Sequence, residues 1–565
     1  MYTIGGSVTG LSGTLVLQDN GGNNLNVTAA GTFTFSTQLA SGAAYDVTVL
    51  TQPSGQTCTV ANGSGTVSAN VTNVAVSCTS SSSGVTIGGT VTGLAGTGLV
   101  LQDNGADDLS ITKNGSFTFS TSLASGTAYA VTASTQPTSP SQTCRVTDGT
   151  GTAGTTNVTS VTVNCVSVGK FAYTASNSGS EIYAFTISAS TGQLTPVSGS
   201  PYTEGASPAA VSLSPNGMFA FSATNDGKDI YAFTINQSSG ALTAVSVTPY
   251  TTGFATGSPY PDIAVSPNSQ YLYLASSGDG EVAGFSIDQT SGALTALPNS
   301  PYTAGLGAAG IPAFSPNGNF LYVVNSTANT VSGFAIGSNG ALTSVGANVA
   351  TGGSPTWIVF TPSGDYAYVS NSAGSISEYS VNTTTGVLTP LSPATVTTAE
   401  TPADLTIDSS GTHLYVPMGT GSSPGGVQVY TINADGTLAA TGILNQVGIG
   451  PRYVDIDPTG RFAYVSSAGT GGTGVYGFTI DPTTGLLTAM NGGAAFPTGN
   501  QPDFITVDPS GQFGYTANQA SGTITGFAIN QTTGALTSVP GSPYTIAGGN
   551  PFFVSISPEA PGIRD

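Results

Sequence analysis

The chain has 565 residues, of which 38% are hydrophobic and only 6% are charged, and its formal net charge is −20. The length exceeds one ordinary domain, and the hydrophobic content is sufficient for buried cores. Seven Lys and Arg residues in the whole sequence leave no basic patch for a phosphate backbone, so we predict no nucleic-acid partner. No stretch approaches the 18 or more apolar residues of a membrane helix, so we predict no membrane span.

The residues from Met1 to Ile4 run directly into strand-like sequence, without the basic segment and apolar stretch of a secretion signal. The remaining composition is acidic and rich in Thr, Ser, Asn and Gly, which favours an extracellular β protein. We therefore expect an extracellular or cell-surface protein whose signal has been removed from this chain.

The first 165 residues contain two copies of one module. The segment IGGSVTGLSGT recurs as IGGTVTGLAGT, and GTFTFSTQLASG recurs as GSFTFSTSLASG. Period-two alternation, as at Phe33 and Phe35, with frequent glycine turns predicts a small β-sandwich. We predict two such domains, residues 1–79 and 80–166, which resemble the immunoglobulin-like modules of secreted bacterial surface proteins.

Each module ends with two cysteines, Cys58 with Cys78 and Cys144 with Cys165. Four cysteines allow three pairings, but the duplication favours one disulfide inside each module. Each bond would close a loop of about 20 residues and stabilise the fold by roughly 3 kcal/mol. Metal binding is the competing interpretation, although no CxxC or nearby histidine supports it. Disulfides imply an oxidising compartment.

Residues 167–565 repeat a unit of about 50 residues. A segment of the FAYTAS type occurs eight times, and a segment of the IYAFTI type follows each copy. Pro-x-Gly corners such as SPNG and DPSG, and TG-x-LT corners, supply the φ angles that tight turns need. Four antiparallel strands in each unit predict the blades of a β-propeller.

The first strand of each unit has the pattern P-x-x-V-x-(V/I)-(S/D)-P, yet no copy precedes Phe171. The missing copy, NPFFVSISP, occupies residues 550–558. We predict that this C-terminal strand completes the first blade, which closes the ring and hides two sheet edges. The fold class is then all-β, with two small sandwiches followed by an eight-bladed propeller. Seven blades are the alternative if one unit is irregular.

The (F/Y)-x-Y-V-(S/N) strands and both kinds of corner resemble the secreted propellers of the lactonase and YVTN-repeat type, which include bacterial 6-phosphogluconolactonase-like proteins. The resemblance covers about residues 168–558. The matching residues belong to the scaffold, so the resemblance implies the fold more than an activity. Lactonases of this type act on anionic sugar or carboxylic lactones, which implies a cluster of Arg, Lys or His around the anion.

The start of each first strand should line the mouth of the central channel, where propellers usually bind ligands. Four residues before each (S/D)-P corner the units present a varied row: Ala210, Asp262, Ile311, Trp357, Asp404, Tyr453, Phe504 and Phe553, with Arg452 and Asp503 one position earlier. Our candidate ligand-binding residues are Asp262, Trp357, Asp404, Arg452, Tyr453, Asp503 and Phe553. Aromatic surfaces with a few carboxylates suit a sugar or a peptide. The alternative is that these side chains only fill a tapering channel.

Catalytic groups are scarce. The one histidine, His413, occupies the position that sister strands fill with Phe or Tyr, so we interpret it as a packing residue. Without it no Ser-His-Asp set can form, and no G-x-S-x-G elbow fits an all-β chain. We assign no catalytic residue. Four repeated loop tyrosines favour packing between blades over a binding girdle: Tyr202, Tyr250, Tyr302 and Tyr544.

Three carboxylates of the row, Asp262, Asp404 and Asp503, could hold Ca²⁺ if they met, but their blades are not adjacent. We therefore predict no metal site and no cofactor. The leading hypothesis is a non-catalytic binding or structural protein of the cell surface, which could self-assemble into a filament or a surface lattice. The alternative is a lactonase-like hydrolase. The sequence leaves the ligand, the oligomeric state and the anchoring mode open.

Overall fold

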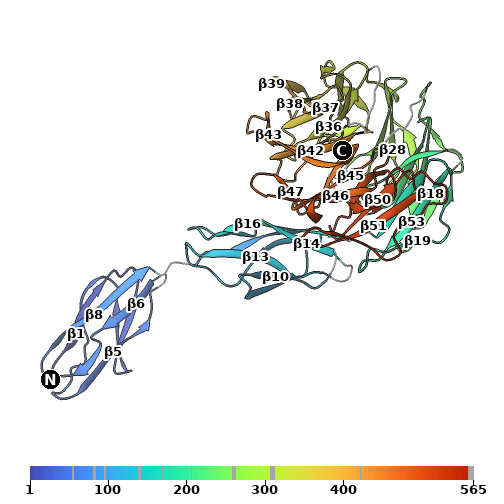
Figure 1. Ribbon diagram of the computed structural model, residues 1–565. Helices are drawn as coiled ribbons and strands as arrows, with labels where there is room; N and C mark the ends of the chain where they lie inside the picture. Colours follow the sequence, from blue (N-terminus) through green and yellow to red (C-terminus); the bar gives the residue numbers. More distant parts are fainter. Residues whose placement is uncertain are drawn as a thin grey trace. The chain divides into compact units, whose positions relative to one another are not determined.

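The computed structural model describes residues 1–53, 56–80, 84–94, 97–137, 142–167, 170–204, 207–256, 263–305, 312–419, 421 and 423–557. The chain divides into two compact units, one formed by residues 1–139 and 144–165 and the other by residues 140–143 and 166–565. Each is described by itself. The strands of the first unit are blue to cyan in Figure 1, and those of the second run from green to red.

The first module consists of two four-stranded sheets that share one hydrophobic core. One sheet has the order β4 (Gly31–Thr34), β1 (Ile4–Thr9), β8 (Val71–Ser80), β6 (Gln56–Ala61). The other has the order β3 (Asn23–Val27), β2 (Leu15–Asp19), β5 (Ala44–Thr51), β7 (Ser64–Thr66). Alternate residues of β2 are buried, as the period-two pattern predicts. A feature that the sequence analysis missed is that β1 pairs with β8 in parallel.

The second module repeats this arrangement. Its sheets have the orders β12 (Gly115–Thr118), β9 (Ile87–Thr92), β16 (Val158–Ser167), β14 (Gln142–Thr147) and β11 (Asp107–Ile111), β10 (Leu99–Asp103), β13 (Ala128–Thr135), β15 (Thr150–Thr152). Glycine is required where the parallel strands approach, because a Cβ on Gly89 would overlap the carbonyl oxygen of Val161. Both predicted disulfides, Cys58–Cys78 and Cys144–Cys165, are present.

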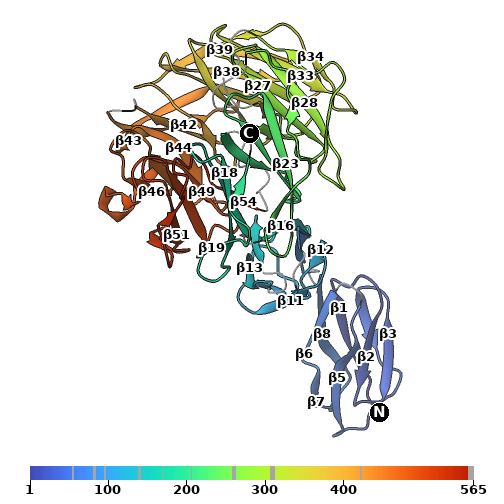
Figure 2. The same ribbon diagram turned by 90° about the vertical axis from the view of Figure 1, so that its right-hand side faces the viewer.

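The described part of the second unit contains eight propeller-like sheets (Figure 2). The first four are formed by β54 (Ser555–Ser557), β17 (Phe171–Ser176), β18 (Glu181–Ile187), β19 (Leu194–Pro196), β20 (Tyr202–Thr203); β21 (Pro208–Leu213), β22 (Phe219–Thr224), β23 (Asp229–Ile235), β24 (Leu242–Ala244), β25 (Tyr250–Thr251); β26 (Ile263–Val265), β27 (Tyr271–Ser276), β28 (Glu281–Ile287), β29 (Leu294–Ala296), β30 (Tyr302–Thr303); and β31 (Ala313–Phe314), β32 (Phe320–Asn325), β33 (Thr330–Ile336), β34 (Leu342–Ser344), β35 (Val349–Ala350).

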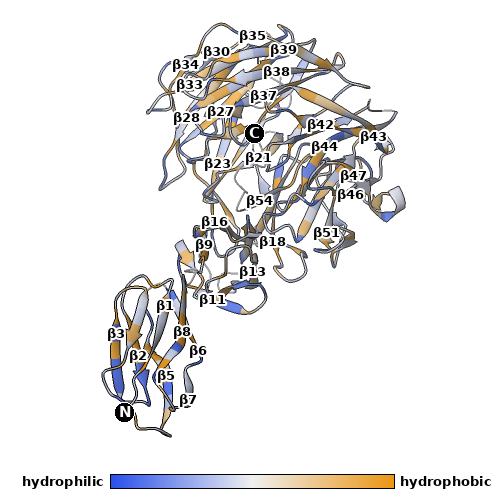
Figure 3. Ribbon diagram, turned by 90° about the vertical axis from the view of Figure 1, so that its left-hand side faces the viewer, coloured by the Kyte–Doolittle hydropathy of each residue, from blue (hydrophilic) through white to orange (hydrophobic). Residues whose placement is uncertain are grey.

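The other four are formed by β36 (Pro355–Phe360), β37 (Tyr366–Asn371), β38 (Ser375–Val381), β39 (Leu388–Thr397); β40 (Thr406–Ile407), β41 (His413–Met418), β42 (Pro424–Ile432), β43 (Leu438–Ile449); β44 (Pro451–Ile456), β45 (Phe462–Ser467), β46 (Gly474–Ile480), β47 (Leu487–Ala489), β48 (Phe496–Pro497); and β49 (Pro502–Val507), β50 (Phe513–Asn518), β51 (Thr523–Ile529), β52 (Leu536–Ser538), β53 (Tyr544–Thr545). A 3-10 turn, η1 (Asn491–Gly493), follows β47. Figure 3 shows the hydrophobic residues, in orange, along these strands.

The C-terminal strand β54 belongs to the sheet that begins near Phe171, as predicted. It pairs antiparallel with β17, with Tyr173 opposite Ser555 and Phe171 opposite Ser557. Side-chain hydroxyls extend the connection, because Thr174 donates to the carbonyl of Phe553 over 2.6 Å and Ser555 donates to the carbonyl of Val211. The last strand in the sequence is therefore bound to the first and second sheets.

A tyrosine–glycine contact joins seven of the eight described sheets to the next, and the second sheet lacks it because Phe221 takes the place of the tyrosine. The tyrosine hydroxyl in the second strand of one sheet donates to the carbonyl of the corner glycine in the following sheet, as in Tyr173 to Gly240 at 2.9 Å. The same contact leads from the eighth sheet back to the first, where Tyr515 donates to Gly192 over 2.6 Å. The other pairs are Tyr273–Gly340, Tyr322–Gly386, Tyr368–Gly436, Tyr415–Gly485 and Tyr464–Gly534.

The corner glycines also serve as flat surfaces for aromatic rings. Gly192 has a φ of +69°, and a Cβ there would overlap the ring of Phe513. We expect Gly192→Ala to destabilise the second unit by about 1–2 kcal/mol for the left-handed backbone and about 1–3 kcal/mol for overpacking. Gly549→Ala is the matched control, because Gly549 has a φ of +66° and open space around it.

The urea midpoint, followed through the fluorescence of the one tryptophan of the sequence, Trp357 in β36, measures this unit alone. Equal midpoint shifts for both variants would contradict a contribution of the Phe513 contact.

Candidate functional site

The predicted row of mouth residues lies where the first strands of the sheets begin. Arg452 and Tyr453 follow Pro451 at the start of β44, and Asp503 and Phe504 follow Pro502 at the start of β49, the first strand of the next sheet. Phe553 precedes β54. These three strands are successive in the contacts described above, so the structure brings Arg452, Tyr453, Asp503 and Phe553 into one group.

Aromatic rings form the centre of this group. The ring of Phe504 lies 5.6 Å from that of Tyr453 and 5.8 Å from that of Phe553. Phe552, which the sequence analysis did not select, contributes a fourth ring 5.6 Å from Phe504. Three of the rings are partly exposed, and only Phe553 is buried. They form a continuous apolar surface that suits one face of a sugar-like ring.

Arg452 lies against this surface. Its guanidinium carbon is 5.5 Å from the ring centre of Phe504 and 5.5 Å from that of Phe552, so two π faces flank the cation. Its Nη1 donates to Oδ1 of Asp503 over 2.9 Å. The side chain of Arg452 is 46% exposed, whereas that of Asp503 is 4% exposed. The guanidinium therefore keeps donors directed at solvent while a buried carboxylate fixes its position.

The charge of Asp503 depends on Arg452. Burial raises the pKa of this carboxyl, and the charge and hydrogen bond of the arginine oppose the shift. The second carboxyl oxygen has no hydrogen-bond partner within the described ranges. We name the six residues Arg452, Tyr453, Asp503, Phe504, Phe552 and Phe553 the Arg452 cluster.

The other three candidate ligand-binding residues, Trp357, Asp404 and Asp262, are not members of the Arg452 cluster. Trp357 is partly buried and packs against the core between the fifth and sixth sheets. Asp404 precedes β40, and its backbone N–H donates to the carbonyl of Arg452 over 3.2 Å, which places it beside the cluster through the backbone. Asp262 lies outside the described residues.

Phe552 could have been found from the sequence. It stands one position before the predicted row, as Arg452 and Asp503 do. The predicted set includes this earlier position only in the seventh and eighth units, at Arg452 and Asp503.

His413 begins β41, the second strand of its sheet, beside Asp408, which follows the end of the first strand β40. The Arg452 cluster instead lies where first strands begin, so His413 does not approach it along its own sheet. Its Nδ1 is 2.9 Å from Oδ2 of Asp408, and its ring lies on Gly485 as the Phe and Tyr rings of sister strands lie on their glycines. The ring therefore fills the packing position that we assigned to it.

We expect His413→Phe to change the free energy of unfolding by less than about 1 kcal/mol, because sister strands place Phe beside an equivalent Asp, as Phe462 lies beside Asp457. His413→Ala should cost about 2–4 kcal/mol through the cavity it leaves. Urea unfolding monitored by Trp357 fluorescence measures the free energy of unfolding of both variants. A Phe variant as unstable as the Ala variant would show that the imidazole itself is needed.

The repeated tyrosines have packing roles in the described loops. Tyr544 accepts a hydrogen bond from the backbone of Leu194 over 3.0 Å and lies 6.5 Å from the ring of Phe185, so it joins the eighth sheet to the first. The hydroxyl of Tyr302 donates to the carbonyl of Pro298 within its own loop. These contacts agree with packing rather than with a binding girdle.

A buried carboxyl that the sequence analysis overlooked follows β20. Glu204 is 3% exposed, and neither of its carboxyl oxygens has a hydrogen-bond partner among the described residues. Burial raises its pKa to about 8, and the hydroxyl of Ser222 opposes the shift only in part. The equivalent positions of the other units hold smaller or uncharged residues: Thr252, Ala304, Thr351, Thr498 and Ile546.

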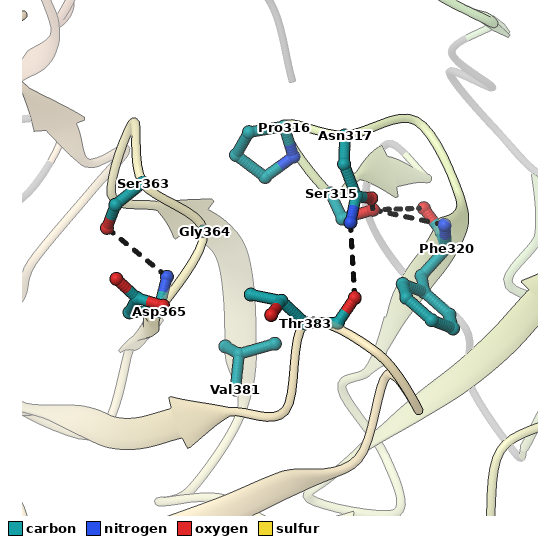
Figure 4. A pocket seen from close by; sticks show the side chains of 9 residues that line it. All are labelled: Ser315, Pro316, Asn317, Phe320, Ser363, Gly364, Asp365, Val381 and Thr383. Atoms are coloured by element: carbon teal, nitrogen blue, oxygen red, sulfur yellow. Dashed lines mark hydrogen bonds between the residues drawn. The ribbon is translucent and has the colours of Figure 1, made fainter.

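A shallow hollow between corners of the fourth and fifth sheets is shown in Figure 4. Asn317 donates there to the carbonyl of Thr383 over 3.3 Å, and the backbone of Asp365 donates to Ser363. Its lining contains one carboxylate and no cation. Across the described ranges, no group of three or more His, Cys, Asp or Glu residues could hold a metal ion. No helix among them is long and apolar enough to cross a membrane.

Propeller-like sheets of four or five strands, joined in order through glycine corners, define a repeat protein of the β-propeller class. The model of the family described as Lactonase, 7-bladed beta-propeller matches residues 125–255, 256–398, 389–500 and 475–556. The chain belongs to this family.

The chain is 26% identical over 171 residues to the 6-phosphogluconolactonase of Serratia proteamaculans, which is 29% of this chain and 49% of that protein. It thus spans about half the length of this curated relative. A solved structure from Bacteroides uniformis has a TM-score of 0.46 at 18% identity and covers 69% of this chain and 99% of its own. The periplasmic gluconolactonase of Pseudomonas aeruginosa has a TM-score of 0.45 at 16% identity and covers 69% and 99%.

Proposed function

We propose that this protein hydrolyses a sugar-like lactone at the Arg452 cluster, and that the cluster lies at the mouth of an eight-bladed propeller. Family membership supports the hydrolase over the non-catalytic protein that led the sequence hypotheses. The observation that carries the proposal is the half-exposed guanidinium of Arg452, held by Asp503 between two phenylalanine faces.

Contacts between the sheets support the blade number in this proposal. The family is described as seven-bladed, whereas eight sheets occur in the described residues. The tyrosine–glycine contact that leads from the eighth sheet to the first supports one closed circle of eight. The immunoglobulin-like character of residues 1–79 and 80–166 remains part of the proposal. The two disulfides support an oxidising compartment outside the cytoplasm.

Lactone hydrolysis needs a group that stabilises the negative charge on the carbonyl oxygen. Water attacks the carbonyl carbon, the ring C–O bond breaks, and a proton passes to the ring oxygen as it leaves. Arg452 is placed to donate to the developing oxyanion, while the rings of Phe504 and Phe552 hold the apolar face of the substrate. The partly exposed Asp404 beside the backbone of Arg452 is our candidate acceptor for the proton of the attacking water.

The charge balance of the cluster favours an uncharged substrate. The positive charge of Arg452 is paired with the carboxylate of Asp503, and the chain as a whole carries −20. A phosphate group would meet this negative field without an unpaired cation in the cluster. We therefore expect a neutral lactone to be preferred over its phosphorylated form.

The purified full-length chain should hydrolyse δ-gluconolactone faster than the spontaneous reaction, and should hydrolyse the 6-phosphorylated lactone with a lower kcat/KM. Acid release at constant pH measures both rates. If no lactone in a panel of sugar and carboxylic lactones is hydrolysed faster than it is spontaneously, the proposed hydrolase activity is refuted. A non-catalytic binding or structural role would then be the better hypothesis.

A further inference from the structure

The two modules of the first unit connect their first and last strands in the same way. In the first module β1 pairs in parallel with β8, with Gly6 opposite Val74 and Thr9 opposite Ser77, and Figure 2 shows the two strands side by side. In the second module β9 pairs in parallel with β16. The chain therefore enters each pair of strands at one end and leaves it at the other. We call each of these two parallel pairs a module seam.

Parallel pairing decides how tension along the chain acts on a module seam. Such tension pulls the start of β1 in one direction and the end of β8 in the other, along the strands. The backbone hydrogen bonds of a sheet run across the strands, so they are sheared together and none is peeled off before the others. In the first module five residue pairs, from Ile4 with Val71 to Thr9 with Ser77, share the load.

Further contacts hold both ends of each module seam. Where the chain enters, the backbone N–H of Thr3 donates to Oδ1 of Asn70 over 3.1 Å, and the equivalent Asn157 accepts in the same way in the second module. Where the chain leaves, the residue after the last pair is a disulfide cysteine, Cys78 or Cys165. The last strand is therefore bonded covalently to its other neighbour, β6 or β14, at the point where the load leaves the module.

The second unit would respond to the same tension differently. Its first strand, β17, pairs antiparallel with its last strand, β54, and Phe171 lies opposite Ser557. The chain thus enters and leaves this pair of strands at the same end. Tension would separate the residue pairs one at a time, beginning with Phe171 and Ser557.

We propose that the two modules are tension-bearing elements, which keep their fold under a pulling force that opens the propeller. The module seam carries the proposal, because both modules combine the parallel pairing, the asparagine at the entrance and the disulfide at the exit. The two modules would then serve as a mechanical tether for the second unit. This function is independent of the hydrolase.

Single-molecule stretching of the full-length chain between its two ends tests the proposal, because resistance to force depends on the unfolding rate rather than on equilibrium stability. We expect the propeller to open first and the modules to unfold last, at a force about twofold higher or more, since five residue pairs share the load in a module seam. Reduction identifies the module events, because all four cysteines of the sequence lie in the modules. Each module event should lengthen by about 70 Å when the disulfide that closes its loop is reduced.

Gly6→Ala should weaken one module seam, because a Cβ on Gly6 would overlap the backbone of Val74 and push β1 away from β8. One of the two module events should shift to a lower force, while the event of the second module stays unchanged. Gly22→Ala is the matched control, since a Cβ on Gly22 has open space around it. Asn70→Ala, which removes the contact with Thr3, provides a second variant if Gly6→Ala does not fold, as judged by the loss of one module event.

Two results would overturn the proposal. One is that the modules of the wild type unfold at or below the force that opens the propeller. The other is that the folded seam variants leave the force of both module events unchanged, because the module seam would then not carry the load.

Discussion

Arg452→Ala should lower kcat/KM for a neutral sugar lactone by about 100-fold or more. Removing one donor to a developing oxyanion commonly costs about 2.7–4 kcal/mol of transition-state stabilisation. The guanidinium is the half-exposed cation of the cluster and is held by Asp503 and two aromatic rings, so no flexible side chain has to be ordered when substrate binds. Initial rates at constant pH with δ-gluconolactone measure the effect.

Loss of stability has to be separated from loss of chemistry in this variant. Arg452→Ala leaves Asp503 buried without its charged partner, which typically costs 3–5 kcal/mol unless the carboxyl takes up a proton. The double variant Arg452→Ala with Asp503→Asn removes both charges and should recover much of that stability without recovering turnover. Recovery of turnover in the double variant would show that Arg452 only neutralises Asp503 and does not act on the substrate.

Glu204→Gln should make the second unit more stable at pH 8 and leave it nearly unchanged at pH 5. Burial raises the pKa of Glu204 from 4.5 to about 8, so the folded chain keeps a proton that the unfolded chain releases. The stability contributed by the protonated carboxyl is therefore complete below pH 4.5 and declines as the pH rises from there to about 8. This difference between the pKa values of Glu204 in the unfolded and folded chain lowers the free energy of unfolding by roughly 4–5 kcal/mol at pH 8. Glutamine is uncharged at every pH, so the variant does not lose this stability as the pH rises.

The measurement is the urea midpoint from Trp357 fluorescence between pH 5 and pH 8.5, for wild type and variant side by side. Other buried carboxyls with raised pKa, such as Asp503 and Glu378, titrate in both proteins, so the difference between the two curves isolates Glu204. Glu400→Gln is the matched control, because Glu400 is exposed and its curve should follow that of the wild type. Parallel curves for Glu204→Gln and wild type would contradict a buried, protonated carboxyl.

The repeat made most of the second unit predictable. The (F/Y)-x-Y strands and glycine corners are local signals, and the structure pairs them as expected, with each tyrosine hydroxyl on the next corner glycine. The displaced copy NPFFVSISP predicted the pairing of β54 with β17, because a first sheet without its leading strand would expose an edge. The duplicated cysteines likewise predicted both disulfides.

The site was only partly predictable. Counting positions before each corner selected Arg452, Tyr453, Asp503 and Phe553, which the structure brings together, and it also selected Trp357, which is partly buried against the core between the fifth and sixth sheets. Equivalent positions in a repeat share a backbone location, whereas the direction and partner of each side chain depend on the neighbouring sheet. The contact of Phe552 with Arg452 and the burial of Glu204 therefore became visible only in the folded chain.

The amino-acid sequence by itself determined the strands, their turns, the order of the sheets and the two disulfides, because φ preferences, period-two burial and repetition act over a few residues or recur at a fixed spacing. Only the tertiary structure decided the parallel pairing of β1 with β8, the enclosure of Glu204 and the contact of Arg452 with Asp503 and two phenylalanines. These features depend on which segments, some 50 or more residues apart, meet in space, and such distances are set by the packing of whole sheets rather than by local sequence.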